Sequence, residues 1–337
     1  MNDPIALPIL LIGYGPVAQQ YAATVRARHD EFGNRYGVEP RVVAIRGRTQ
    51  QVLLPDGKAP PARGGWTART PLAELLTLAS PLVVAQAVPS HPDGAEEALS
   101  DGLTALSHGA HLVTATKSPL LTGWSRLRDT ALEHGRGVRV SGATGAALPA
   151  GDIARTGLRG FDVRTIRGCV NGTAGFVLDQ LGDGVTLPEA IAMAQSRGIA
   201  EADPSADLSG ADAATKLCLL AGLQWGWDVT ACTVEAEPIT IAAAARAVRV
   251  NERGAVLRHV GSASIDDPGR VVVALREFSR SEPPFGVLTG PEKAVTFGCG
   301  DAGDITVSGG RSSPLGAALS MVKDTLSLVI DPSPGLG

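Results

Sequence analysis

The chain has 337 residues, which is too many for one small hydrophobic core, so we expect two domains. Its net charge of −4 and its lack of a long basic run argue against a nucleic-acid or anionic membrane surface as partner. No signal-peptide start and no membrane-length apolar run occur, and the 4 cysteines are scattered without metal-ligand spacing, so we expect a cytoplasmic protein with reduced thiols.

The first predicted strand is the apolar run Ile9–Ile12, and a glycine-rich turn follows it. Residues 13–18 have the pattern GxGxxA between this strand and a predicted helix. Glycines let backbone N–H groups approach a pyrophosphate, and a helix N-terminus stabilises its charge. We therefore predict dinucleotide binding here, with an ordinary tight turn as the alternative. The predicted cofactor-binding residues of the turn are Gly13, Gly15, Pro16 and Val17.

The second predicted strand, Arg41–Ile45, is followed by Arg46-Gly47-Arg48. In NAD-binding proteins, an acidic residue at this strand end accepts hydrogen bonds from the ribose 2′-hydroxyl. No acid is present here, whereas the guanidinium groups of Arg46 and Arg48 suit a 2′-phosphate. We therefore predict NADP in preference to NAD, and the alternative is that both arginines are solvated loop charges.

The rest of the N-terminal half alternates between strand and helix patterns after a surface loop at residues 56–65. We predict strands at 82–84, 111–114 and 138–141, and helices at 95–108 and 124–134. This alternation predicts an α/β fold with a doubly wound parallel sheet. Lys117 directly follows the strand at 111–114, at the sheet edge where ligands of such folds bind.

A second group of candidate residues lies between Gly198 and Lys216. Four acids and one lysine occur there: Glu201, Asp203, Asp207, Asp212 and Lys216. Ser209 and Asp212 have the spacing of a helix N-cap and its third-position acid, which predicts that a helix begins here. Asp212 and Lys216 then share one helix face. The pattern fits either a capped helix with a surface ion pair, or a substrate site in which an aspartate holds a lysine.

Taken in order, five motifs make this chain resemble homoserine dehydrogenase. They are the GxGxV turn at residues 13–17, Thr114-Ala115-Thr116-Lys117, a glycine-rich segment ending in Leu148-Pro149, Gly168-Cys169-Val170-Asn171-Gly172-Thr173, and the segment 198–216. The resemblance covers residues 7–226 and implies the short form, without a C-terminal ACT domain. It implies reversible hydride transfer between a nicotinamide cofactor and aspartate 4-semialdehyde, giving L-homoserine for threonine and methionine biosynthesis.

The resemblance also implies a domain organisation. A Rossmann-type domain is expected at residues 1–141, with a C-terminal helix at about 312–337 packed back on it. A substrate-binding and dimerisation domain of the α+β type, with a mixed sheet, is expected at residues 142–311. We expect strands at 271–275 and 294–297 and helices at 239–250 and 315–328, and the apolar strands of this domain favour a homodimer.

Aldehyde reduction develops negative charge on oxygen, so a cation or proton donor is needed beside it. We expect Lys216, held by Asp212, to fill this role, and Lys117 to lie where cofactor and substrate meet. Glu201 and Asp207 are expected to bind the substrate ammonium group. Gly172 and Thr173 are expected to contact substrate, Asn171 the cofactor, and Asp203 to fix its own loop.

Several residues depart from the family pattern. Ser141 stands where the family often has a glutamate that helps to hold a monovalent cation, so a metal site stays an open question. Backbone carbonyls around Thr144 and Ala146 are the remaining candidates for a weakly held cation. Ile199 replaces a tyrosine near the expected substrate. A diverged relative acting on another small aldehyde or hydroxy acid is therefore an alternative.

Two other functional classes are also considered. Phosphorylating aldehyde oxidation, as in aspartate-semialdehyde dehydrogenase, needs a cysteine nucleophile with a nearby base. Cys169 is the candidate, but it precedes Val170 in a predicted strand and has no evident histidine partner. A non-catalytic NADP-binding sensor could keep the glycine turn and the arginines, although it would have no need of the acid and lysine set.

Overall fold

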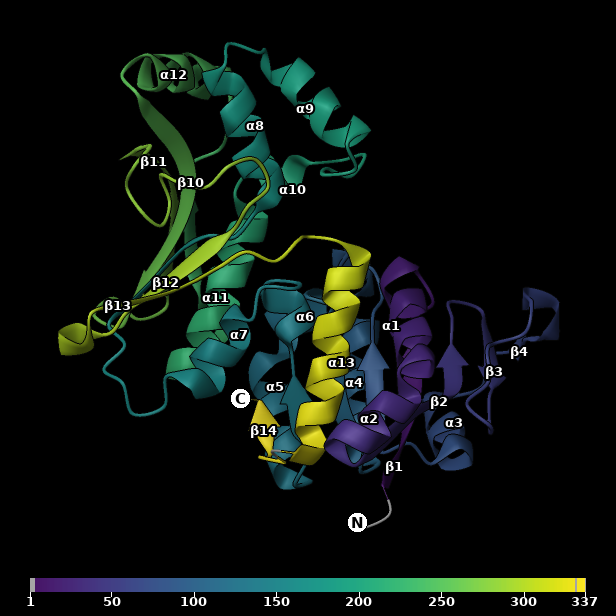
Figure 1. Cartoon of the computed structure of the whole chain (residues 1–337). Helices are drawn as coiled ribbons and strands as arrows, with labels where there is room; N and C mark the ends of the chain where they lie inside the picture. Colours follow the sequence, from purple (N-terminus) through teal and green to yellow (C-terminus); the bar gives the residue numbers. More distant parts are fainter. Residues whose placement is uncertain (1–3, 331, 337) are drawn as a thin grey trace. The chain divides into compact units, whose positions relative to one another are not determined.

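The structure is a computed structural model that describes residues 4–330 and 332–336. It divides the chain into two compact units, Met1–Ala146 with Ser313–Gly337, and Ala147–Ser312 (Figure 1). The first unit has a largely parallel sheet and the second has a mixed sheet, which confirms the predicted fold class. Within the described ranges, no helix combines the length and the apolar character that crossing a membrane requires.

The first unit contains an eight-stranded sheet with the order β14-β7-β6-β5-β1-β2-β3-β4. Its strands are β1 (Ile5–Ile12), β2 (Val38–Arg46), β3 (Gln50–Leu53), β4 (Thr67–Ala68), β5 (Val83–Gln86), β6 (His111–Thr114), β7 (Gly137–Arg139) and β14 (Gly335–Leu336). The strands from β14 to β2 run parallel, whereas β3 and β4 add in antiparallel fashion. Ile9, Leu10 and Leu11 of β1 are all fully buried, as expected for a central parallel strand with both faces covered.

Helices cover this sheet on both faces. They are α1 (Pro16–Ala27), α2 (His29–Tyr36), α3 (Leu72–Ala79), α4 (Ala95–Ser107), α5 (Ser118–Glu133), α6 (Ser141–Thr144) and α13 (Pro314–Ile330), with short 3₁₀ turns at Arg63–Gly65 and Pro92–Gly94. Figure 1 shows α13, in yellow, beside α1 over one face of the sheet. The two helices are joined by a 2.7 Å hydrogen bond between the Tyr21 and Thr325 hydroxyls, and burial raises the pKa of Tyr21.

Among the element boundaries in this unit that differ from the predicted ones, two have a clear structural reason. The helix predicted from residue 124 begins at Ser118, because Pro119 fits the first helical turn. It is interrupted at Gly123, where an added Cβ would lie 2.4 Å from Leu99 Cδ1. The strand predicted at 138–141 ends at Arg139, because the backbone N–H and hydroxyl of Ser141 bind the Asp324 carboxylate instead of extending the sheet.

The second unit contains a six-stranded sheet with the order β13-β12-β8-β10-β11-β9. Its strands are β8 (Thr165–Cys169), β9 (Thr233–Ala236), β10 (Ala255–Ser264), β11 (Arg270–Ser279), β12 (Ala294–Gly298) and β13 (Asp304–Ser308). Every pairing in this sheet is antiparallel except that of β9 with β11. In the β12–β8 pair, Ala294 stands opposite Cys169, so the segment before β12 runs alongside the end of β8.

The helices of the second unit carry most of the predicted substrate residues. They are α7 (Ala150–Asp152), which continues into a π-helical turn at Ile153–Gly157, α8 (Gly172–Gly182), α9 (Leu187–Ser196), α10 (Ser205–Leu208), α11 (Ala211–Trp225) and α12 (Ile241–Glu252), with 3₁₀ turns at Val229–Ala231 and Gly300–Ala302. Helices α8, α11 and α12 pack on β10, and α11 also packs on β8 and β11. The sheet therefore fixes the starts of α8 and α11, where the candidate residues are concentrated.

Candidate active site

The glycine turn after β1 has the geometry of a nucleotide-binding turn. The Gly13 N–H donates to the Arg46 carbonyl at 2.8 Å, and Gly13 has a φ of +93° that an L side chain rarely adopts. A Cβ at Gly13 would lie 2.3 Å from the Ala87 carbonyl oxygen, so only glycine fits. At Gly15, the N-cap of α1, a Cβ would meet no atom within 4 Å. The start of α1 is thus open to an anion, and these residues fit a bound dinucleotide.

The two arginines at the end of β2 differ in exposure, and this corrects the phosphate-binding role predicted for Arg46. Its side chain is buried, Nη1 donates to the Thr70 carbonyl at 2.6 Å and to Gln51 Oε1 at 3.3 Å, and burial lowers its pKa. Arg46 ends a strand whose side chains point alternately to the two faces, and here its side chain points inward. Arg48 is exposed, as a phosphate-binding side chain requires.

Lys117 belongs to the first unit and Lys216 to the second. Lys117 is the N-cap residue of α5, directly beyond the carboxyl end of β6, as predicted. Its backbone N–H donates to Ser90 Oγ at 2.8 Å, and its side chain is half-buried.

In the second unit, Asp212 and Lys216 form a nearly buried ion pair. The Lys216 ammonium donates to Asp212 Oδ2 at 2.6 Å and to the Val170 carbonyl at 3.0 Å. The two side chains are only 10% and 12% exposed, so this pair is not a solvated surface salt bridge. An ammonium has three N–H groups, which leaves one without a partner among the described residues.

Asn171 joins this ion pair to Asp207. Its Nδ2 donates to Asp207 Oδ1 at 2.5 Å and to Asp212 Oδ2 at 2.8 Å, and its Oδ1 caps α8 by accepting from the Ala174 N–H at 2.8 Å. The Asn171 amide thus binds two carboxylates, and the cofactor contact predicted for this residue stays a prediction. Asp207 is half-buried, and its Oδ2 has no partner within the described residues, so it is available to a ligand cation.

The predicted cap of α11 is wrong. The helix begins at Ala211, its N-cap is Gly210 with a φ of +84°, and no side chain caps it. Ser209 ends the short helix α10, and its hydroxyl accepts a hydrogen bond of 3.4 Å from the Ala211 N–H. A Cβ at Gly210 would lie 3.0 Å from His259 Cε1, so the turn is tight as well as left-handed.

The loop before α10 places the other predicted residues. Glu201 is exposed, and its carboxylate has no protein partner in the described part of the chain. Asp203 accepts from the Ser205 N–H at 3.0 Å, which lowers its pKa and fits the predicted loop-fixing role. Thr173 donates to the Ile199 carbonyl at 3.2 Å. A Cβ at Gly172 would lie 2.9 Å from the Pro291 carbonyl oxygen, so Gly172 permits close backbone packing.

The family model for homoserine dehydrogenase matches residues 149–326, which include this cluster. The chain belongs to the homoserine dehydrogenase family. The homoserine dehydrogenase of Methanocaldococcus jannaschii is 25% identical over 96% of this chain and 98% of its own length. The NAD(+)-dependent homoserine dehydrogenase of Pseudomonas canavaninivorans is 23% identical over 95% of each chain. A solved structure of a hyperthermophilic archaeal homoserine dehydrogenase in complex with NADPH shares the fold, with a TM-score of 0.81, 23% identity and coverage of 99% of this chain and 100% of that one.

Sequence reasoning missed two aromatic residues and one arginine beside the nucleotide turn of this homoserine dehydrogenase family member. The Tyr14 and Trp66 rings have centroids 5.3 Å apart, and the Arg63 guanidinium lies 4.1 Å above the Trp66 ring. A Cβ at Gly47 would lie 3.2 Å from Arg63 Nη1. The Arg63 guanidinium therefore lies beside the backbone of Gly47, the residue that precedes Arg48. Arg63 begins a short 3₁₀ turn within the loop between β3 and β4, so no sequence periodicity pointed to it.

Sequence reasoning also missed Lys293, a lysine with only 1% of its surface exposed. Burial lowers its pKa to about 8, the charge of Lys216 acts in the same direction, and Asp212 opposes them. Lys293 was missed because it belongs to no motif, and nothing in the sequence around it indicates that it is buried close to Lys216.

The oxygens around Ser141 do not fit the monovalent cation of the family. The Ser141 hydroxyl lies 2.8 Å from both Asp324 Oδ1 and the Lys323 ammonium, and the Ala146 carbonyl accepts from the Ser320 hydroxyl. Hydrogen bonds within the protein thus use the oxygen lone pairs that a cation would need as ligands. Among the residues that the structure describes, no cluster of three or more His, Cys, Asp or Glu side chains could hold a metal.

Cys169 does not have the properties of a catalytic nucleophile. It is the last residue of β8, it is buried, and burial raises the pKa of its thiol to about 12. A thiol is nucleophilic as the thiolate, and such a pKa leaves almost none at neutral pH. The structure therefore gives no support to phosphorylating aldehyde oxidation through this residue.

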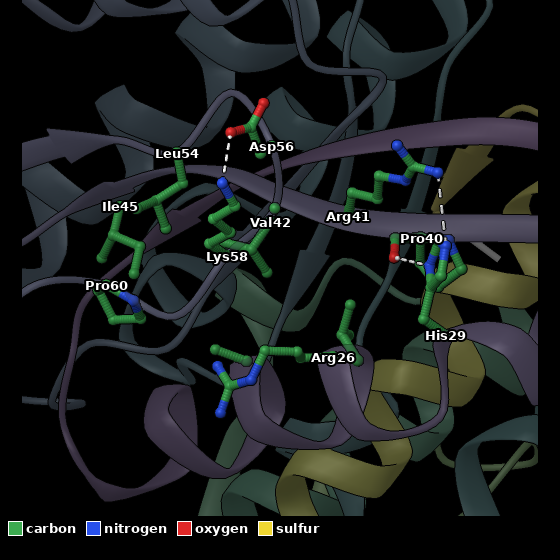
Figure 2. A pocket seen from close by; sticks show the side chains of 13 residues that line it. Arg26, His29, Pro40, Arg41, Val42, Ile45, Leu54, Asp56, Lys58 and Pro60 are labelled. Atoms are coloured by element: carbon green, nitrogen blue, oxygen red, sulfur yellow. Dashed lines mark hydrogen bonds and ion pairs between the residues drawn. The ribbon is translucent and has the colours of Figure 1, made fainter.

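A cavity of about 300 Å³ lies elsewhere in the first unit, between α1, β2 and the loop after β3 (Figure 2). Figure 2 shows the apolar side chains of Val42 and Ile45, and close to them Lys58, which pairs with Asp56 at 3.0 Å. None of the residues predicted to bind cofactor or substrate lines this cavity. It is therefore not the site of the chemistry described above.

Proposed function

We propose that this protein is an NADP-dependent homoserine dehydrogenase. The reaction is reversible hydride transfer between NADPH and aspartate 4-semialdehyde, giving L-homoserine in threonine and methionine biosynthesis. The observation that carries the proposal is the nearly buried Asp212–Lys216 pair, with Asp207 joined to it through Asn171. This cluster lies inside the region that the homoserine dehydrogenase family model matches.

When bound, the nicotinamide cofactor supplies or accepts the hydride. Lys216 directs one N–H toward the aldehyde oxygen and donates its proton as negative charge develops there. Asp212 and the Val170 carbonyl hold the ammonium in place, so little reorganisation is needed during reduction. Lys117, beyond the end of β6, adds a second cation at the nucleotide-binding edge of the first unit.

The substrate ammonium group is bound by carboxylates. Asp207 Oδ2 and the Glu201 carboxylate lack protein partners in the described structure, and both belong to the segment that leads into α11. A charge-assisted hydrogen bond to each would orient the amino acid with its aldehyde toward Lys216. Gly172 and Thr173 line the start of α8, next to Asn171, and complete the proposed substrate pocket.

The preference for NADP rests on Arg48 and Arg63. One relative is named as NAD(+)-dependent and one solved structure is described with NADPH, so the relatives do not decide the question. Both arginines are exposed, and the Arg63 guanidinium lies beside Gly47 at the end of β2, where the ribose 2′ position is expected. In this proposal Arg63 binds the 2′-phosphate in place of Arg46, whose side chain is buried.

Substituting Arg48 or Arg63 by alanine is expected to raise KM for NADPH about tenfold each, because each removes a charge-assisted bond worth about 1.4 kcal/mol. KM for NADH should change less than twofold, since NADH has no 2′-phosphate. Arg41→Ala is the matched control, because Arg41 is an exposed arginine of β2 that pairs with Glu39 at 2.8 Å. Equal losses with both cofactors, or a wild-type preference for NADH, would contradict NADP specificity.

The assay that tests the proposed function follows NADPH oxidation in the presence of aspartate 4-semialdehyde, with L-homoserine identified as the product. Turnover of other small aldehydes with none of this substrate would favour the diverged relative. NADPH binding without turnover of any aldehyde would favour the non-catalytic sensor. The same preparation, measured by light scattering after size exclusion, tests the predicted homodimer.

A further inference from the structure

The segment before β12 is held against the catalytic cluster by its backbone. The Gly290 N–H donates to Asp179 Oδ2 of α8 at 2.6 Å, and a Cβ at Gly175 would lie 2.8 Å from the Gly290 carbonyl oxygen. Likewise, a Cβ at Gly172 would lie 2.9 Å from the Pro291 carbonyl oxygen. Lys293 follows in this segment, and its carbonyl accepts from the Gly309 N–H at 3.0 Å. Its backbone position is therefore fixed by α8 and by the β13 end of the sheet.

The register of β12 with β8 places Lys293 beside the atoms that hold Lys216. Because Ala294 is opposite Cys169 in an antiparallel pair, Lys293 stands opposite Val170. The carbonyl of Val170 is one of the two acceptors of the Lys216 ammonium. Lys293 is 1% exposed, so its charge is not screened by solvent.

The charged groups around Lys293 come from several packed elements. Helix α11 supplies Asp212 and Lys216, and Asp207 of α10 is joined to them through Asn171. Asp179 of α8 is paired with Arg258 of β10 at 2.6 Å, and Glu292 accepts from the Thr289 N–H. The charges that act on the Lys293 ammonium are those of Lys216 and Asp212.

We propose that Lys293 is a positioning residue of the active site, whose buried positive charge favours proton donation from Lys216 to the substrate oxygen. This inference rests on the proposed function, in which Lys216 is the proton donor. With both lysines protonated, their two positive charges balance those of Asp207 and Asp212. The nearby cation favours proton release from Lys216 to the developing alkoxide, and no covalent bond to Lys293 is involved.

Removing this charge has an expected direction. In Lys293→Met, the two carboxylates face one ammonium, and the cation that favours proton transfer to the developing alkoxide is lost. We expect kcat for aldehyde reduction at pH 7 to fall about tenfold, and this loss to shrink above pH 8, where Lys293 of the wild type gives up its own proton. KM for the aldehyde should stay within about twofold, because Glu201 and Asp207 bind the substrate.

The experiment is a kcat profile from pH 6 to 10 for the full-length protein with aspartate 4-semialdehyde. Lys293→Gln, which removes the charge and keeps a polar side chain, should lose kcat at pH 7 as Lys293→Met does, with the same convergence on the wild type above pH 8. Lys58→Met is the control, since Lys58 is an exposed lysine paired with Asp56. Wild-type kcat at pH 7 in both Lys293 variants, with an active wild type, would overturn the inference and leave the proposed function intact.

A second measurement does not depend on the reaction. A buried lysine with a lowered pKa binds its proton less tightly in the folded state than in the unfolded state, so folded stability rises as pH increases past 8. Lys293→Met should therefore melt at a higher temperature than the wild type at pH 7, and this difference should shrink between pH 8 and 10. A melting difference that does not change with pH would refute a charged Lys293 in this cluster. Absence of turnover in the wild type would instead contradict the proposed function.

Discussion

Replacing Lys216 by methionine is expected to lower kcat for aspartate 4-semialdehyde about 10³-fold, the largest activity loss that we predict for one side chain. Loss of a general acid typically costs 10²–10⁴-fold, and the same ammonium also stabilises the developing alkoxide. In the proposed function, Lys117 is a second cation of the first unit and is not the proton donor. KM for the aldehyde should change much less than kcat.

The substitution also leaves Asp212 nearly buried without its cation, so stability must be followed beside activity. Asn171 still donates to Asp212 in the variant, which limits the cost to about 1–3 kcal/mol. The double variant Asp212→Asn with Lys216→Met removes the unpaired charge and should recover most of the stability but none of the activity. A Lys216→Met protein that is folded, binds NADPH and keeps more than a tenth of wild-type kcat would show that another group donates the proton.

Gly13→Ala is expected to destabilise the protein by about 3 kcal/mol or more and to abolish NADPH binding. The new Cβ would lie 2.3 Å from the Ala87 carbonyl oxygen, which is backbone and so cannot rotate away, and the φ of +93° is strained for alanine. The measurements are the melting temperature and the Kd for NADPH by fluorescence. A shift of several degrees is expected for this loss of free energy.

Gly15→Ala separates cofactor binding from stability. A Cβ at Gly15 would meet no protein atom within 4 Å, and its φ of −81° is open to any residue. The melting temperature should therefore stay close to that of the wild type, whereas the methyl group would occupy the space through which a pyrophosphate reaches the start of α1. We expect NADPH to bind at least about tenfold more weakly. Unchanged NADPH affinity in Gly15→Ala would place the cofactor elsewhere.

Most of the first unit could be predicted from sequence because its elements are locally encoded. β1 is an apolar run because both of its faces are buried, and α1 follows a turn in which glycine and proline have fixed geometric uses. The two short strands β3 and β4 carried no such pattern, since they lie at an edge and β4 is exposed. The loop between them nevertheless supplies Arg63 and Trp66 to the nucleotide side of the sheet.

The candidate site was predictable in its residue types and less so in their contacts. The spacing of Asp212 and Lys216 gave their ion pair directly, because residues four apart on a helix are neighbours. The inward turn of Arg46 and the two bonds of Asn171 depend on partners 24 to 41 residues away, which no local pattern encodes. The cap at Gly210 was missed because a left-handed glycine before a helix resembles a loop residue, and Ser209 has the commoner capping chemistry.

The return of α13 and β14 to the first unit fixes an order of events during synthesis. Asp324, fully buried on α13, accepts from the Ser141 N–H and hydroxyl, and β14 pairs with β7 at the sheet edge. Residues 147–312 therefore leave the ribosome before the first unit has all its parts, although that unit contains the N-terminus. Until α13 is made, the nascent nucleotide-binding sheet has one side of its core uncovered. This stage of synthesis therefore depends most on protection from aggregation.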